Sequence, residues 1–306
     1  MILGLDIGGT NIKAGVVNAG KIVRRYRFPT RAHQRQAAVE QIKRVVDRFA
    51  GRISAVGIGC AGIIDSEKGI VRYSPNFAGW ENVELGPILA RDFNKPVRVI
   101  NDVNAIMLGE WKYGAARGYD NAFLFTLGTG VGGAAVVEGK LLFGACGFAG
   151  EFGHTTIDFK GPRCACGNRG CLERYVGSRH IVDLARRLIR NERSALRAYG
   201  ALSPRIIARE ARRGDRVARA VFDRIGTYIG IGVSSIVNLL DPEIVIVSGG
   251  IARAGAILFD PVRRTVDQLI LGATFRDLKI IPAKLGDDAG VLGAAAWAAE
   301  KSVRKR

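Results

Sequence analysis

Three cysteines lie within eight residues of one another, in a chain that has five cysteines in all. They are Cys164, Cys166 and Cys171, and glycines lie between them. A structural zinc ion takes four ligands, and His154, ten residues upstream, can supply the fourth. The spacing therefore predicts a Cys₃His zinc site, and three free thiols are the alternative.

Two carboxylates flank the cysteines, Glu151 before them and Glu173 after them. A zinc finger that binds nucleic acid usually carries a reading helix, or basic and aromatic residues between its ligands. Carboxylates suit the hydroxyls of a sugar better than they suit phosphates. We therefore interpret the segment as a structural clip and not as a zinc finger that binds nucleic acid.

Glycine-rich turns follow three apolar segments of the chain. Such turns can bind a polyphosphate, because glycine has no Cβ to keep the backbone N–H groups away from it. In the first turn, Asp6 is expected to handle Mg²⁺ through water, and Lys13 to add positive charge. A third turn, at 248–251, ends a strand before a helix and suits the nucleoside. The residues expected to face the nucleotide are Gly8, Gly9, Thr10, Asn11, Gly128, Thr129, Gly130, Gly132, Gly133, Gly249 and Gly250.

The elements that must position these turns occur twice. Residues 2–28 and 121–144 each contain an apolar strand, a Gly/Thr turn, a second strand, a Gly-Lys turn and a third strand. Gly8 of the first segment aligns with Gly128 of the second. We interpret this as an internal duplication, with two unrelated hairpins as the alternative.

Strands and helices alternate along the rest of the chain. A helix is expected at about 34–49 and two or three helices between 178 and 240, and residues 96–105 predict a strand followed by a polar loop before the next helix. The alternation predicts an α/β fold with two duplicated lobes and a cleft between them. The expected lobes are 1–116, joined by a C-terminal helix at about 288–306, and 117–287, which carries the zinc knuckle at 154–171.

The chain is basic, with 46 lysines and arginines against 28 aspartates and glutamates and a net charge of +18. A basic chain can bind polyanions, but here the arginines are spread over amphipathic helices, and only residues 301–306 form a compact basic run. The charge therefore favours a generally basic surface over a nucleic-acid-binding face.

Composition also bears on location. The N-terminal residues lead directly into a strand and a glycine turn, which argues against a signal peptide. We find no uninterrupted apolar stretch of about 18 residues, so no membrane span is expected. An odd number of cysteines, three of them clustered, favours metal binding in a reducing compartment over disulfides. A cytoplasmic protein is expected.

The chain is similar to sugar kinases of the ROK family (repressor, open reading frame, kinase), in the hexokinase–actin ATPase superfamily. The motifs that carry the resemblance are DIGGTNIK at 6–13, NDVNA at 101–105, GTGVGG at 128–133, GEFGH at 150–154, CACGNRGCLE at 164–173 and SGGI at 248–251. The resemblance implies an actin-like, ribonuclease H-like fold whose two lobes close over substrate. It also implies transfer of the γ-phosphoryl group of ATP to a hexose hydroxyl, usually O6.

The resemblance also implies roles for single residues. Asp102 matches the catalytic base of the family. The residues that match sugar contacts are Asn76, Asn101, Glu151, His154 and Glu173, with His154 bridging sugar and zinc. Elementary chemistry agrees, because a sugar hydroxyl is a poor nucleophile and needs a carboxylate to accept its proton. A helix N-cap is the alternative role for Asp102. Relatives often have proline where this chain has Ala61, and this departure concerns the stiffness of that loop.

The six sugar-site residues resemble those of glucokinases, so glucose is the expected substrate. N-acetylmannosamine, N-acetylglucosamine, fructose and mannose stay open, as does polyphosphate in place of ATP. The family also contains transcriptional repressors, which carry a helix-turn-helix segment before the first phosphate turn. That turn begins at residue 6 here, which argues against a repressor, and an intact Asp102 argues against a non-catalytic sugar sensor. We therefore expect an enzyme. Family members are commonly dimers or tetramers, and the same is expected here.

Overall fold

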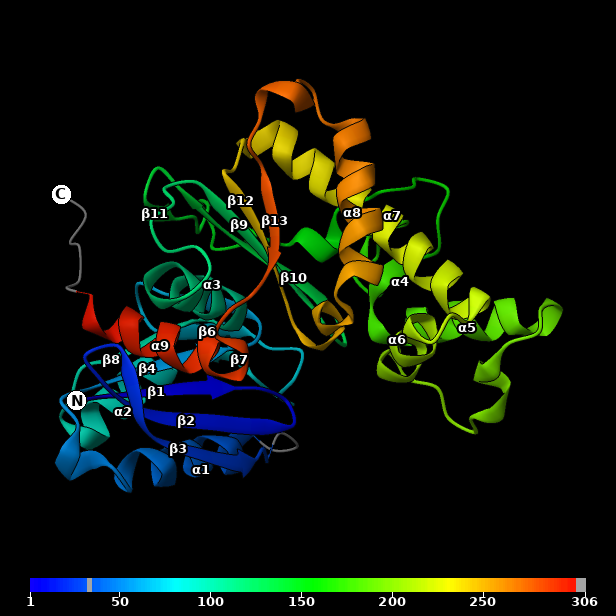
Figure 1. The fold of residues 1–306 in the computed structure, drawn as a ribbon. Helices are drawn as coiled ribbons and strands as arrows, with labels where there is room; N and C mark the ends of the chain where they lie inside the picture. The colour runs from blue at the N-terminus through cyan, green and yellow to red at the C-terminus, as the bar shows by residue number, and fades with distance from the viewer. Residues whose placement is uncertain (32–34, 301–306) are drawn as a thin grey trace. The chain divides into compact units, whose positions relative to one another are not determined.

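The computed structural model describes residues 1–31 and 35–300. Its chain divides into two compact units (Figure 1). Unit 1 comprises Met1–Gly118, Leu141–Ala149 and the segment that begins at Lys284, and unit 2 comprises Tyr119–Lys140 and Gly150–Ala283. The basic run predicted at 301–306 and the first residue of the helix predicted at 34–49 lie outside the described residues. The lobe boundaries drawn at 116 and 287 stay a prediction.

The main sheet of unit 1 has five strands in the order β3-β2-β1-β4-β8. Its central strand β1 pairs antiparallel with β2 and parallel with β4, and β4 pairs parallel with β8. The strands are β1 (Ile2–Ile7), β2 (Asn11–Asn18), β3 (Lys21–Pro29), β4 (Ala55–Cys60) and β8 (Val97–Asn101). A second, three-stranded sheet contains β5 (Ile63–Asp65), β6 (Ile70–Tyr73) and β7 (Glu81–Val83).

The sheet of unit 2 repeats this order as β11-β10-β9-β12-β13. Its strand β9 pairs antiparallel with β10 and parallel with β12, as β1 does with β2 and β4. The strands are β9 (Ala122–Leu127), β10 (Val131–Val137), β11 (Lys140–Leu141), β12 (Ile244–Ser248) and β13 (Lys279–Pro282). The same topology in both units confirms the predicted duplication.

The helices of unit 1 are α1 (Arg35–Asp47), α2 (Leu85–Phe93), α3 (Asp102–Tyr113) and α9 (Ala289–Ala299), with 3₁₀ turns η1 (Ala50–Arg52) and η6 (Gly286–Asp288). The helix α9 lies beside strands from the start of the chain (Figure 1). Glycines permit this contact, because a Cβ on Gly4 would lie 2.1 Å from the carbonyl oxygen of Val291, and one on Gly57 would lie 1.7 Å from that of Ala294. The backbone of α9 therefore rests directly on the sheet.

Two predictions about helix ends were wrong. No polar loop separates β8 from α3, which begins at Asp102, because the side chain of Asn101 caps the helix directly after the strand. The helix predicted to reach residue 306 ends within the described residues at Ala299, since Glu300 adopts an extended backbone.

The helices of unit 2 are α4 (Glu173–Val176), α5 (Ser178–Asn191), α6 (Pro204–Arg212), α7 (Arg216–Leu240) and α8 (Ala256–Leu269). Its 3₁₀ turns are η2 (Phe152–His154), η3 (Ala195–Ala198), η4 (Gly250–Ala254) and η5 (Ala273–Phe275). Three helices between 178 and 240 agree with the prediction. By length and composition, α7 alone among the described helices passes as a candidate membrane span, and 56% of its most apolar window is buried inside the structure. Packing in the core of unit 2 accounts for that apolar character.

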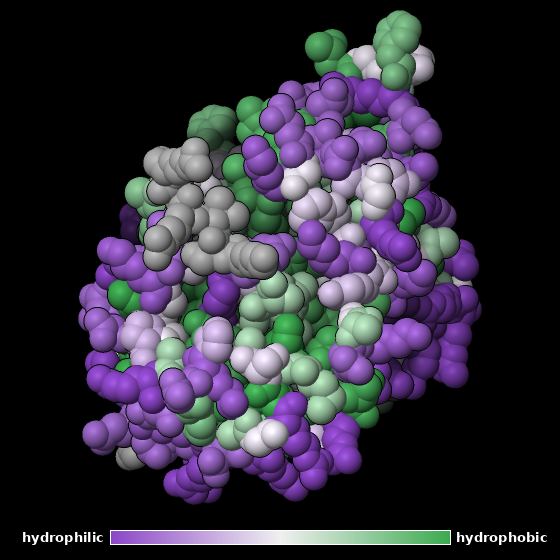
Figure 2. Space-filling model, turned by 90° about the vertical axis from the view of Figure 1, so that its left-hand side faces the viewer, coloured by the Kyte–Doolittle hydropathy of each residue, from purple (hydrophilic) through white to green (hydrophobic). Residues whose placement is uncertain are grey.

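The face drawn in Figure 2 is hydrophilic around most of its rim, with hydrophobic side chains through its middle and at its upper edge. The loop after α8, at the top of Figure 1, carries Leu271 and Phe275, which are 81% and 92% exposed. Asn238, near the end of α7, binds the backbone of Leu269 and Leu271, and Leu239 beside it is also exposed. We call Leu239, Leu269, Leu271 and Phe275 the α7–α8 corner.

Candidate functional site

The parallel strands of unit 1 bring their carboxyl ends together. In the register of the sheet Ile7 pairs with Cys60, and Cys60 pairs with Asn101. Residues that directly follow these strands therefore lie at one edge of the sheet, where α/β proteins bind ligands. Asp102 and the Gly8–Asn11 turn are both at this edge.

The side chain of Asn101 fixes the start of α3. Its Oδ1 accepts hydrogen bonds from the backbone N–H groups of Val103 and Asn104, at 2.8 and 3.1 Å, and its Nδ2 donates to the carbonyl of Gly62 at 3.0 Å. Asn101 is thus the N-cap of α3, and Asp102, for which this role was the alternative, is not. Asp102 is the first residue of the helix, where its carboxylate interacts favourably with the helix dipole.

The turn between β1 and β2 is held by its own backbone and by Thr30. Gly8 N–H donates to the carbonyl of Asn11 at 3.0 Å, and the Thr30 hydroxyl donates to the carbonyl of Gly8 at 2.7 Å. Asn76 packs over this turn, because a Cβ added to Gly9 would lie 3.3 Å from the Cβ and Cγ of Asn76. The structure thus brings one predicted sugar contact against the predicted phosphate turn.

Lys13 lies between two carboxylates at the end of β1. Its Nζ is 3.5 Å from Oδ2 of Asp6 and 3.3 Å from Oδ1 of Asp287. Burial raises the pKa of Asp6, and the charge of Lys13 opposes this shift. Sequence reasoning did not single out Asp287, although the pair of aspartates before the Ala-rich helix was a visible signal.

The matching turn of unit 2 lies between β9 and β10. Oε2 of Glu173 accepts the backbone N–H of Val131 at 2.9 Å, and a Cβ added to Gly130 would lie 2.7 Å from the same oxygen. Ser178, at the start of α5, donates its N–H and its hydroxyl to the carbonyl of Gly128, at 2.9 and 2.7 Å. Glu173, predicted as a sugar contact, therefore also supports the phosphate turn. Nothing in the sequence pointed to Ser178.

A cavity of about 500 Å³ opens beside this turn within unit 2. Gly128 and Gly250, both predicted to face the nucleotide, line it. Three arginines also line it, Arg205 and Arg212 from α6 and Arg253 from η4. Sequence reasoning missed these arginines, because α6 reads as an ordinary amphipathic surface helix. Gly249 has a φ of +94°, and a Cβ there would lie 2.2 Å from the carbonyl oxygen of Leu127.

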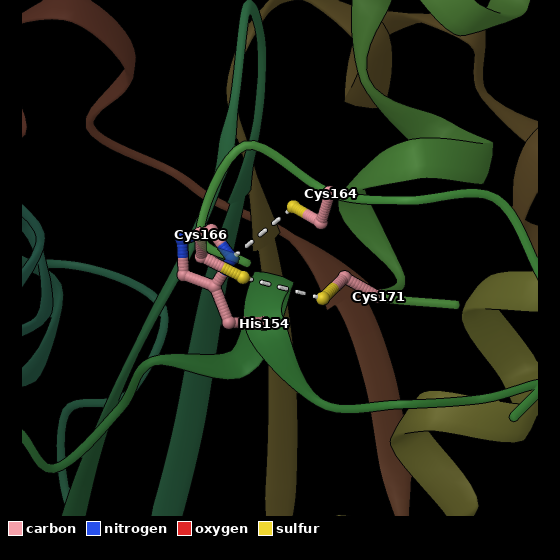
Figure 3. Close-up of side chains that lie close together, drawn as sticks. All are labelled: His154, Cys164, Cys166 and Cys171. Atoms are coloured by element: carbon pink, nitrogen blue, oxygen red, sulfur yellow. Dashed lines mark hydrogen bonds between the residues drawn. The ribbon is translucent and has the colours of Figure 1, made fainter. Parts of the chain in front are cut away.

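The four predicted zinc ligands form one cluster (Figure 3). Their ligand atoms all lie within 4.8 Å of one another. Nδ1 of His154 is 3.8 Å from Sγ of Cys164, and Sγ of Cys166 is 3.6 Å from Sγ of Cys171. Tetrahedral zinc with Zn–S bonds of about 2.3 Å places two sulfurs about 3.8 Å apart. The residues present therefore fit a tetrahedral zinc ion.

The loop around the cluster is shaped by glycine. Gly170 has a φ of +66°, and a Cβ there would lie 1.6 Å from the carbonyl oxygen of Asp158, so another residue would break the loop. Burial raises the pKa of the Cys171 thiol to about 12. The backbone N–H of Asn168 lowers the pKa of Cys166, which is exposed.

His154 faces two ways. Its Nδ1 points to the sulfurs, while its Nε2 lies 4.0 Å from Oε2 of Glu151. Glu151 is exposed, and Glu173 follows Cys171 by two residues. Predicted sugar contacts therefore lie in the chain on both sides of the cluster.

The predicted site residues divide evenly between the units. Unit 1 carries Asn76, Asn101 and Asp102, and unit 2 carries Glu151, His154 and Glu173. Unit 1 also carries one glycine-rich turn, with Asp6, Thr10, Asn11 and Lys13 in or beside it. Unit 2 carries two, one with Thr129, Gly132 and Gly133 and one with Gly249 and Gly250.

His180 supports the start of α5 next to the unit 2 turn. Its Nε2 lies 3.0 Å from Nη1 of Arg174. Burial, and then the charge of Arg174, lowers the pKa of His180, while Asp183 and Glu173 oppose the shift. The folded protein therefore favours the neutral imidazole.

This shift predicts a pH dependence of stability. An unfolded histidine has a pKa of about 6.5, so below that pH the unfolded chain binds a proton that folded His180 resists. Stability should therefore fall as the pH drops below about 6.5. Measured from pH 7.5 to 5.5, the midpoint of thermal unfolding should fall less steeply in His180→Gln than in the wild type. Equal slopes would exclude His180 as the cause.

Comparison with known proteins agrees with these features. The model of the ROK family matches residues 2–301. A glucokinase of Thermotoga maritima is 38% identical over 309 residues, covering 98% of each chain. A ROK family glucokinase of Streptomyces griseus, solved with glucose and AMPPNP, is 34% identical with a TM-score of 0.84, over 98% of this chain and 99% of that one. A xylose repressor of Caldicellulosiruptor bescii is 36% identical over 245 residues, covering 79% of this chain and 61% of the repressor. The mixed α/β fold is that of the ROK sugar kinases, and the chain belongs to the ROK family.

Proposed function

We propose that the protein is an ATP-dependent glucokinase, which transfers the γ-phosphoryl group of ATP to a hydroxyl of glucose, with O6 as the acceptor. The observation that carries the proposal is similarity over nearly the whole chain to glucokinases, one of them solved with glucose and an ATP analogue. The chain covers 98% of the Thermotoga maritima glucokinase but only 61% of the Caldicellulosiruptor bescii xylose repressor.

Asp102 is the proposed general base. It stands at the carboxyl edge of the unit 1 sheet as the first residue of α3, whose N-cap is its neighbour Asn101. Its carboxylate would accept the proton of the sugar hydroxyl during transfer. Asn76, Asn101, Glu151, His154 and Glu173 are the proposed contacts to the other sugar groups.

The three glycine-rich turns and the unit 2 cavity are the proposed nucleotide-binding elements. The turns offer backbone N–H groups to phosphates, and the cavity beside Gly128 and Gly250 is of a size that suits a nucleoside. Asp6 would hold Mg²⁺ through water, and bound Mg²⁺ supplies charge neutralisation for the phosphates.

Zinc is the proposed occupant of the cysteine cluster, in a structural role. All four ligand positions come from the chain, so no position is left to activate water. The proposed location is the cytoplasm, where the five free thiols would stay reduced.

The test of the proposed function is the release of ADP from Mg-ATP by zinc-loaded protein. Glucose, mannose, fructose, N-acetylglucosamine and N-acetylmannosamine would be compared at equal concentrations. We expect the highest kcat/KM with glucose. A higher value with an N-acetylhexosamine would change the substrate, and no turnover with any sugar would contradict the kinase assignment.

We also propose that the α7–α8 corner binds a second copy of the chain, giving a dimer or tetramer. Monomers rarely expose several large apolar side chains together. Phe275→Asp should therefore shift the mass measured by light scattering toward the monomer. Phe159→Asp is the matched control, since Phe159 is 76% exposed but lies outside the corner. An unchanged mass in Phe275→Asp would exclude this surface.

A further inference from the structure

One fully buried carboxylate outside the proposed site binds several backbone groups. Glu110 lies on the last turns of α3. Its Oε2 accepts the backbone N–H of Ala115 at 2.7 Å and that of Lys284 at 3.2 Å. Its Oε1 accepts the N–H of Leu285 at 2.7 Å. Charge-assisted hydrogen bonds of this kind offset the cost of burying a charge.

The chain after α3 also wraps around Glu110. The carbonyl of Glu110 accepts the N–H groups of Gly114 and Ala116, at 2.9 and 3.0 Å. A Cβ added to Gly114 would lie 2.0 Å from Oε2 of Glu110. Five backbone N–H groups therefore converge on one residue, and glycine is required beside it.

Glu110 binds one segment by which the chain leaves unit 1 and another by which it returns to unit 1. The first leads from α3 to Gly118, the last residue before the chain enters unit 2. The second begins at Lys284, the first residue after unit 2. From there it continues through η6, where Asp287 pairs with Lys13 and Asp288 with Arg25, into α9.

The interface of α3 with α9 is built from small residues. A Cβ added to Gly109 would lie 2.3 Å from the carbonyl oxygen of Ala289, and one added to Gly293 would lie 1.7 Å from that of Ala105. Such contacts set the distance between the helices but provide few ridges to resist sliding along the axis. The hydrogen bonds of Glu110 oppose that sliding, because they join the end of α3 to the segment that leads into α9.

Asp102 is the first residue of the same helix. Eight residues separate it from Glu110, or about 12 Å at 1.5 Å per residue. A shift of α3 along its axis moves Asp102 by the same amount. A misplacement of about 1 Å can cost an enzyme about 100-fold in rate.

We propose that Glu110 is a positioning residue, whose carboxylate fixes α3 along its axis and so places Asp102 for phosphoryl transfer. The inference rests on the proposed glucokinase function. Glu110 is fully buried and binds backbone N–H groups, so it acts on kcat through Asp102.

The test is Glu110→Gln, which keeps the size of the side chain but replaces one accepting oxygen with an NH₂ group that faces a backbone donor. We expect kcat to fall at least about tenfold, while the KM values for glucose and ATP change less than about threefold. The matched control is Glu210→Gln in unit 2. Glu210 is also buried and hydrogen-bonded, to the hydroxyl of Tyr199 at 2.8 Å and to Arg209. It should lose thermal stability but keep kcat.

Three outcomes would overturn the inference. The first is a folded Glu110→Gln variant with wild-type kcat. The second is an equal loss of kcat in Glu110→Gln and Glu210→Gln, which would mark a purely structural effect. If Glu110→Gln fails to fold, Gly114→Ala is tested in its place, because the added Cβ displaces the same carboxylate and should lower kcat in the same way. Wild-type kcat in Gly114→Ala is the third outcome. The proposed function is judged separately, by whether the wild type phosphorylates glucose.

Discussion

Replacing Asp102 with asparagine is expected to lower kcat for glucose phosphorylation by about 10²- to 10⁴-fold, the usual contribution of a general base. The amide keeps an oxygen that can accept the N–H of Val103, as Oδ1 of Asp102 does at 3.0 Å, so the helix should still begin there. The KM for ATP should change little. Steady-state kinetics with saturating glucose would measure both.

Asp215→Asn is the matched control for this experiment. Asp215 is also an aspartate at a helix start, where it caps α7 by accepting the N–H of Ala218. It lies in unit 2 and is not one of the proposed sugar contacts. Asp215→Asn should keep the wild-type kcat. If Asp102→Asn lost no more kcat than this control, Asp102 would be excluded as the general base.

Replacing Cys166 with serine is expected to remove zinc from the protein and to raise the KM for glucose. Structural zinc sites supply roughly 10–16 kcal/mol of binding energy in small zinc-binding peptides, so loss of one ligand is severe. Cys166 is exposed, so the change removes a ligand with little loss of packing. His154 and Glu173 lie within or beside the cluster, and the sugar contacts should loosen with it.

Zinc content by elemental analysis and glucose KM would be measured on the same preparation. Cys146→Ser is the control, because Cys146 is the other exposed cysteine and lies outside the cluster. It should keep both zinc and affinity. Full zinc content together with wild-type KM in Cys166→Ser would contradict the structural role.

The sequence predicted those parts of the fold that depend on local pattern. The paired Gly/Thr turns marked the two halves, and the spacing of Cys164, Cys166 and Cys171 marked the metal cluster, because each pattern is contained in a short stretch of chain. The start of α3 was missed, since both Asn101 and Asp102 are good caps and only the structure shows which side chain turns back on the helix.

Features made by distant segments were not predictable. Glu110 looks like any glutamate on a helix, and its burial depends on Lys284 and Leu285 returning to it. The arginines of α6 line a cavity that residues of η4 and of the turn after β9 also line. Such groupings depend on how the elements pack, which residue type and periodicity do not encode.

The contact of α9 with Gly4 and Gly57 has a consequence for how the chain is made. Synthesis delivers the strands of unit 1 first, then all of unit 2, and only afterwards the helix that covers the glycine-lined face of those strands. Unit 2 can complete its core once Ala283 has emerged from the ribosome. Until α9 has been made, the strands of unit 1 therefore expose an apolar face, the kind of surface that chaperones bind during translation.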